Sequence, residues 1–172
     1  NPQWAAGSGA WIFVETLSPT AGTSVTSATL PTTSDLFMVV FENLRADISG
    51  GSLFLRLNSV ASANYDYVKQ EDAALTLVSA ATEIIIAETG QSGGTVNAIN
   101  GVIYVPRLNL NGIQVAGCLV SGGAGGADEM YKFHSANWRS AASANITTLN
   151  FVVSGGAIVF SSGAIHIFRS AQ

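Results

Sequence analysis

Runs of β-branched and aromatic residues alternate along the chain with stretches of Gly, Ser, Asn and Thr. In the run 52–58 every second residue is a leucine, at Leu53, Leu55 and Leu57. A period of two is typical of a β-strand that turns one face to the core. Short strands broken at close intervals by turn residues predict a β-sandwich or jelly roll.

The pattern predicts nine strands. They cover residues 11–16, 24–30, 36–44, 52–58, 83–87, 102–105, 113–120, 146–153 and 164–168. No change in composition marks a second domain, and no internal repeat is visible. We therefore predict a single all-β domain over residues 1–172, an antiparallel jelly-roll-like β-sandwich of about eight to ten strands. Residues 1–9 are a candidate N-terminal arm.

Two segments interrupt this pattern. Lys69 to Ser79 is the best helix candidate, with room for one or two turns, and such a short helix is marginal without packing. The glycine-rich stretch Ser121 to Gly126 begins a connection of roughly 20 residues that runs to Ser143. Connections of this length are usually functional or held by a neighbour, so we expect a long loop here.

The composition favours assembly. Apolar residues make up 48% of the chain and charged residues only 10%, against roughly 25% in typical soluble domains. A surface so poor in charge suits contact with copies of the chain or with other subunits, although a neutral surface of Ser, Thr, Asn and Gly is the alternative. The net charge of −4 and the lack of a basic stripe argue against nucleic-acid binding. No apolar run is long enough to insert into a membrane.

The residues that carry chemistry form no catalytic constellation. Cys118 is the single cysteine, which excludes an internal disulfide and a cysteine-based zinc site, and its apolar surroundings predict a core thiol. His166 is expected to be a satisfied or solvent-facing strand histidine, with Ile165 and Ile167 on the opposite face. The clustered carboxylates are expected to be solvated loop acids. We predict no enzyme activity, no cofactor and no metal.

Aromatic residues in loops or at strand ends are the best candidates for a binding site. Flat rings pack on the C–H face of a sugar while polar groups read its hydroxyls. The alternative is that these rings pack under loops or at a subunit interface. The candidate glycan-binding residues are Tyr65, Tyr67, Tyr131, His134, Trp138 and Arg139.

Strand and turn patterns over nearly the whole chain resemble the β-sandwich modules of tailed-bacteriophage tail fibres, head fibres and spikes. The resembling segments are an opening strand at 9–16, Phe41-Glu42-Asn43-Leu44-Arg45 followed by Asp47 and Ser52-Leu53-Phe54-Leu55-Arg56-Leu57, Tyr65-Asp66-Tyr67 in the place of a tyrosine-bearing strand, and 146–151 with 160–168 as a closing hairpin. Arg169-Ser170 replaces the closing glycine-isoleucine of that pattern. These motifs carry fold information and no active-site signature.

The resemblance implies a virion protein at the surface of an extracellular particle. Such modules trimerise, and several contact host-surface polysaccharide. We therefore expect a homotrimeric fibre or spike domain that contacts other virion proteins and attaches to a host-surface glycan. Two alternatives stay open: a capsid decoration or minor capsid protein with a purely architectural role, and a glycan depolymerase with two carboxylates facing one groove. Because the chain begins at Asn1 and not at Met, processing and a fragment are both open.

Overall fold

A computed structural model describes residues 11–47, 51–71, 74–88, 98–106, 113–121, 131–138, 145–154 and 158–171. These residues form twelve β-strands in two antiparallel sheets, and no helix occurs among them. The predicted all-β sandwich is confirmed, with two strands more than the upper end of the expected count. Within the described ranges no helix is long and apolar enough to cross a membrane.

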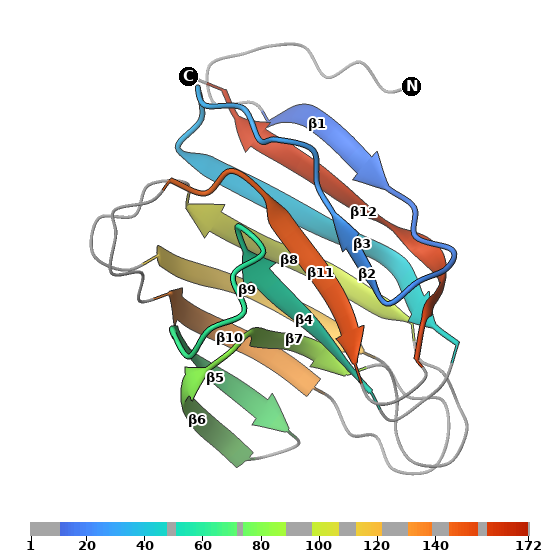
Figure 1. Ribbon diagram of the computed structural model, residues 1–172, viewed down its shortest axis with the longest axis vertical. Coiled ribbons are helices and arrows are strands. Elements are labelled where there is room, and N and C mark those ends of the chain that lie inside the picture. Colours follow the sequence, from blue (N-terminus) through green and yellow to red (C-terminus); the bar gives the residue numbers. More distant parts are fainter. Residues whose placement is uncertain are drawn as a thin grey trace.

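The larger sheet has eight strands and the smaller sheet has four (Figure 1). In spatial order the larger sheet contains β1 (Trp11–Leu17), β12 (Phe160–Ser170), β3 (Leu36–Ala46), β8 (Ile99–Pro106), β9 (Ile113–Ser121), β10 (Tyr131–Trp138), β5 (Tyr65–Glu71) and β6 (Ala74–Ala81). The smaller sheet contains β2 (Ser24–Thr26), β11 (Leu149–Ser154), β4 (Ser52–Leu57) and β7 (Ile84–Glu88).

Eight of the strands follow the winding of a jelly roll. In chain order β1, β2, β3 and β4 alternate between the two sheets, β7 stays with β4 in the smaller sheet, and β8, β11 and β12 alternate again. This gives β1-β12-β3-β8 facing β2-β11-β4-β7. The other four strands are two insertions, β5 with β6 between β4 and β7, and β9 with β10 between β8 and β11. The insertions meet where β10 pairs with β5, and they extend the larger sheet beyond β8 (Figure 1).

The core lies between the sheets because each strand turns its apolar positions inward. On β3, Phe37, Val39 and Phe41 are buried and the residues between them are half-buried. The ring of Phe41 meets that of Phe151 from β11 edge to face, with centroids 5.6 Å apart, so the two sheets touch directly through aromatic side chains. One cluster of buried residues includes side chains from both sheets.

The nine strands expected from alternation are all present, with shifts at their ends. The tyrosine-bearing strand that the resemblance implies is β5. The helix prediction for Lys69 to Ser79 is wrong, because this segment is the end of β5 and most of β6. The long loop from Ser121 to Ser143 is also wrong in part, because it contains β10. In both places pairing with a neighbouring strand overrides weak local preference.

The closing hairpin is wrong as well. β11 belongs to the smaller sheet and β12 to the larger one, so this connection crosses between the sheets. The candidate N-terminal arm and the glycine-rich segment 122–126 lie outside the described residues.

Candidate functional site

Three of the candidate glycan-binding residues lie in the core. The exposed fractions of the Tyr65, Tyr67 and Trp138 side chains are 0%, 5% and 2%. Tyr65 opens β5 and Trp138 ends β10, as expected for strand ends, but their rings point between the sheets. A buried ring has no face to offer a sugar, so the prediction that these three rings form a glycan platform is corrected.

The hydroxyl of Tyr65 shows why this ring is held inside. It accepts a hydrogen bond from the backbone N–H of Leu57 at 3.1 Å and donates one to the carbonyl of Val60 at 2.9 Å. These bonds tie β5 to the end of β4 and compensate for the burial of the polar group. Burial raises the pKa of Tyr65 to about 12, because the phenolate would lose its hydration.

The other three candidates are only partly placed. Tyr131 is the first residue of β10, and His134 lies inside the same strand rather than in a loop. Arg139 lies outside the described residues. Of the candidate residues, Tyr65 and Trp138 are register partners across the β5–β10 pair, and Tyr67 is the partner of Ala136.

His166 is a satisfied strand histidine, as predicted. Its Nδ1 lies 2.8 Å from Oγ1 of Thr16, and its Nε2 lies 2.9 Å from a carboxylate oxygen of Glu42. Ile165 and Ile167 are fully buried on the opposite face. Among the described residues no group of three or more His, Cys, Asp or Glu side chains could hold a metal ion.

The outer face of the larger sheet carries the most exposed apolar side chains. Within the described ranges the exposed large hydrophobic residues are Phe13, Leu75, Leu77 and Tyr104. They come from β1, β6 and β8, all in the larger sheet. Such exposure is unusual for a sheet that faces only water, where polar residues normally occupy the outward positions.

Strand register connects three of these residues in one row. Cross-strand partners share a face of a sheet. Successive partners across all eight strands are Phe13, Phe168, Met38, Tyr104, Ala116, Ser135, Val68 and Leu77. Phe13 and Leu77 therefore stand at the two ends of one row on the outer face.

At the β1 end the row becomes an aromatic patch. The rings of Phe13 and Phe168 meet edge to face with centroids 5.8 Å apart. The rings of Trp11 on β1 and Tyr104 on β8 approach to 6.0 Å, although β12 and β3 lie between their strands. We call Trp11, Phe13, Met38, Tyr104 and Phe168 the outer aromatic face. The exposed fractions of the Phe13 and Tyr104 side chains are 56% and 40%.

The sequence contains a signal for this face that strand prediction alone does not use. In β1 the residues Trp11, Ile12, Phe13 and Val14 are apolar on both faces of the strand. A strand of this kind is normally covered on both faces. Because the smaller sheet covers only one face, the sequence of β1 already indicates a second contact.

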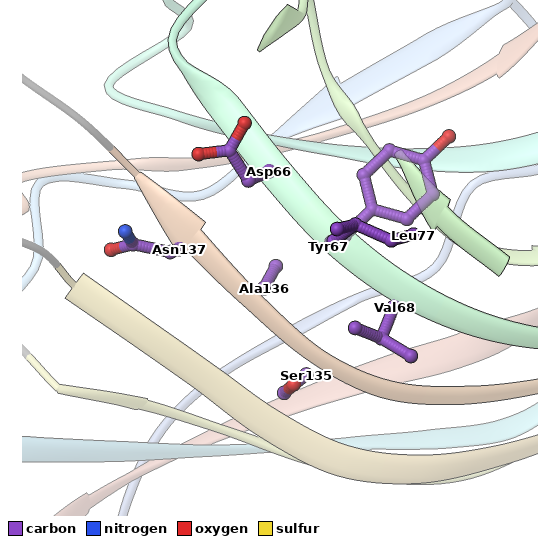
Figure 2. Close-up of a pocket in the computed structure, with 7 residues that line it drawn as sticks. All are labelled: Asp66, Tyr67, Val68, Leu77, Ser135, Ala136 and Asn137. Carbon is purple, nitrogen blue, oxygen red and sulfur yellow. The ribbon is translucent and has the colours of Figure 1, made fainter. Parts of the chain in front are cut away.

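At the other end of the sheet a shallow hollow of about 190 Å³ opens over β10, β5 and β6 (Figure 2). Its lining residues are Asp66, Tyr67, Val68, Leu77, Ser135, Ala136 and Asn137. One carboxylate oxygen of Asp66 accepts a hydrogen bond from the backbone N–H of Ala80 at 2.9 Å, which fixes the carboxylate against the end of β6. Among the described lining residues Asp66 supplies the one carboxylate, whereas glycoside hydrolysis ordinarily uses a pair.

Comparisons with protein-family models, with curated proteins and with solved structures found no match for this chain.

Proposed function

We propose that this chain is a structural subunit of a bacteriophage-like virion, a fibre or spike domain that assembles with copies of itself as a homotrimer. The observation that carries the proposal is the outer aromatic face, where Phe13 and Tyr104 expose large rings on the side of the larger sheet that faces away from the smaller sheet. Covering these rings removes apolar surface from water, which favours association. The resemblance of the strand and turn patterns supports the virion context.

The low charge of the chain supports the same proposal. With 10% charged residues, few like charges oppose the approach of a second copy. On the outer face, Glu42 is paired with His166 beside the aromatic residues. A polar pair at the margin of an apolar patch is the usual anatomy of a protein–protein interface.

Attachment to a host-surface polysaccharide is the second part of the proposal, and it rests on the resemblance. The burial of Tyr65, Tyr67 and Trp138 takes away the ring faces that were expected to support it. A purely architectural role, as a capsid decoration or minor capsid protein, is therefore the candidate that the burial of these rings favours next.

The test is the mass of the chain in solution, measured by light scattering or native mass spectrometry. The single chain has a mass of 17.7 kDa, and a homotrimer has three times this mass. We expect Phe13→Glu to shift the trimer to monomer, because it places a charge in the contact. Thr23→Glu, at an exposed residue before β2, is the control and should leave the trimer intact. A natural chain that stays monomeric at micromolar concentration overturns the proposal.

A screen against glycan arrays and host cells tests the attachment part separately. Binding by the trimer supports an adhesive fibre or spike domain. A trimer that binds no sugar and no host cell contradicts attachment and leaves the architectural role.

A further inference from the structure

Among the described strands, residues 74–78 of β6 form a sheet edge without the usual protection against pairing. β6 ends the larger sheet, and its sequence Ala-Leu-Thr-Leu-Val-Ser-Ala-Ala contains no charged residue and no proline. Natural proteins normally place Lys, Pro, a bulge or a covering segment on such an edge. β6 does carry one bulge, where its register with β5 shifts between Val78 and Ala81 and Ala80 has a positive φ of 55°. This bulge lies near the end of the strand and leaves residues 74–78 in regular register.

Two leucines make this edge apolar as well as open. The exposed fractions of the Leu75 and Leu77 side chains are 68% and 69%, the highest among the described large hydrophobic residues. They lie two residues apart and therefore on the same face of the strand. Leu77 is the register partner of Val68, in the same row as the exposed Tyr104, so both leucines lie on the outer face of the sheet.

We propose that β6 pairs antiparallel with β6 of a second copy of this chain, about a two-fold axis at Thr76. In this register Leu75 of one copy lies opposite Leu77 of the other, and the same pair is repeated by symmetry. It is the one antiparallel register that sets both leucines opposite leucines. Thr76 then lies opposite Thr76 on the other face, and both kinds of cross-strand pair stabilise sheets. The edge is thus complementary to itself, which is what a two-fold contact requires.

The charges near this edge allow the approach of an identical copy. Lys69 of β5 is the register partner of Thr76, one strand behind the edge. With strands about 4.8 Å apart, the Lys69 backbones of the two copies would lie about 14 Å apart, three strand spacings. This exceeds the Debye length of about 8–10 Å, so repulsion between them is largely screened at physiological salt.

This contact is independent of the outer aromatic face. That face is built on β1, β12, β3 and β8, and β6 is the opposite edge of the same sheet (Figure 1). Both contacts can be occupied at once. The edge contact would then join subunits that belong to different trimers, a linkage that the proposed function does not include.

Disulfide trapping tests the register directly. Residues directly opposite in an antiparallel pair have Cα atoms about 4.5 or 5.5 Å apart, both within the range that a disulfide spans. Thr76→Cys should therefore form a covalent dimer of twice 17.7 kDa under mild oxidation, with peptide mapping that joins residue 76 to residue 76. The natural chain, whose single cysteine is Cys118, gives the background.

Ser79→Cys is the matched control, because it is exposed on the same strand. In the proposed register the two copies of residue 79 are about 20 Å apart along the strand, too far to be bridged. We expect Thr76→Cys to cross-link at least tenfold faster than Ser79→Cys, and adding Leu77→Lys to Thr76→Cys to remove this advantage. Equal rates for the two cysteines, or no dimer from Thr76→Cys in a protein that melts like the natural chain, would overturn the proposal.

Combining Thr76→Cys with Phe13→Glu separates this inference from the proposed function. Cross-linking that persists after the trimer is lost supports the edge contact alone. A trimer without a 76–76 disulfide supports the proposed function alone.

Discussion

The indole ring of Trp138 stacks on the phenol ring of Tyr65, with centroids 6.3 Å apart and an angle of 17° between the ring planes. The two residues are also register partners across the β10–β5 pair. Because β10 belongs to one insertion and β5 to the other, this stacked pair joins the two insertions where they meet. Both rings are buried, so the pair supports the extension of the larger sheet from inside.

Truncation of this pair should destabilise the fold. We expect Trp138→Ala to lower the free energy of unfolding by about 3–5 kcal/mol, as for other buried Trp side chains. Trp138→Phe should cost less, because the Nε1–H of Trp138 is buried with no hydrogen-bond partner among the described residues, and phenylalanine removes this group. Urea denaturation measures both. A Trp138→Ala protein of natural stability that loses glycan binding would instead restore the ring to a binding surface.

Tyr65→Phe isolates the buried hydroxyl. The substitution keeps the ring but leaves the N–H of Leu57 and the carbonyl of Val60 without their partner. We expect a loss of about 1–3 kcal/mol in the free energy of unfolding at pH 7. Tyr104→Phe, on the exposed outer face, is the control and should change stability by less than about 0.5 kcal/mol.

The same hydroxyl should make stability fall in alkali. Burial raises the pKa of Tyr65 to about 12, whereas an unfolded tyrosine loses its proton near pH 10. Between these values the unfolded state holds fewer protons than the folded state, so the free energy of unfolding decreases as the pH rises. The contribution is fully present below pH 10 and is lost by about pH 12. The stability difference between the natural chain and Tyr65→Phe should therefore shrink from pH 9 to pH 11, and a constant difference would contradict a buried neutral phenol.

The regular part of the fold could be predicted from the sequence, because alternation marks strands such as β3 and β4 that turn one face to the core. The pairing of strands distant in sequence could not. The segment Lys69 to Ser79 was predicted as a short helix, and β10 falls within the predicted long loop, because neither segment shows its partner strand locally. The candidate site was misplaced for the same reason, because the local sequence does not show which strands pair. Tyr65 and Trp138 look available beside turn residues, and only their pairing across two insertions shows that they are buried.

Asn58 should be sensitive to substitution because it connects the end of β4 to the segment before β11. Its Oδ1 accepts from the backbone N–H of Thr147 at 2.7 Å and of Thr148 at 3.2 Å, and its Nδ2 donates to the carbonyl of Asn145 at 3.0 Å. Its φ of 53° also suits asparagine better than alanine. We expect Asn58→Ala to cost about 2–4 kcal/mol in thermal or urea unfolding.

Ser59→Ala is the matched control for Asn58→Ala. Ser59 has a similar φ of 56° in the same turn, and its side chain is exposed. We expect it to cost less than about 1 kcal/mol, because no bridging bonds are lost. Similar losses for the two variants would mean that backbone strain, and not the hydrogen bonds of Asn58, decides the stability of this turn.

Gly163 should be the least tolerant of the described glycines. It lies in β12 at a register shift opposite β3, with φ of 97°. A Cβ at this position would overlap the carbonyl oxygen of Asn43 and the Cα of Leu44, which are backbone atoms that cannot rotate away. Asn43 itself has a positive φ of 47°, so the two strands approach through matching distortions. We expect Gly163→Ala to lose more than about 3 kcal/mol, from backbone strain together with the forced separation of β12 from β3.

Gly22→Ala separates these two causes. Gly22 also has a positive φ, 78°, but no atom lies within 4 Å of an added Cβ. Gly22→Ala should therefore lose only the cost of strain, about 1 kcal/mol.

The two variants should also differ in their effect on the trimer. β12 lies between β1 and β3 and carries Phe168, so a shift of this strand would also disturb the outer aromatic face. Gly163→Ala should then weaken the trimer as well as the fold, while Gly22→Ala leaves the trimer intact. Equal losses of stability for the two variants would show that β12 and β3 can separate at little cost and that their close approach does not hold the face in place.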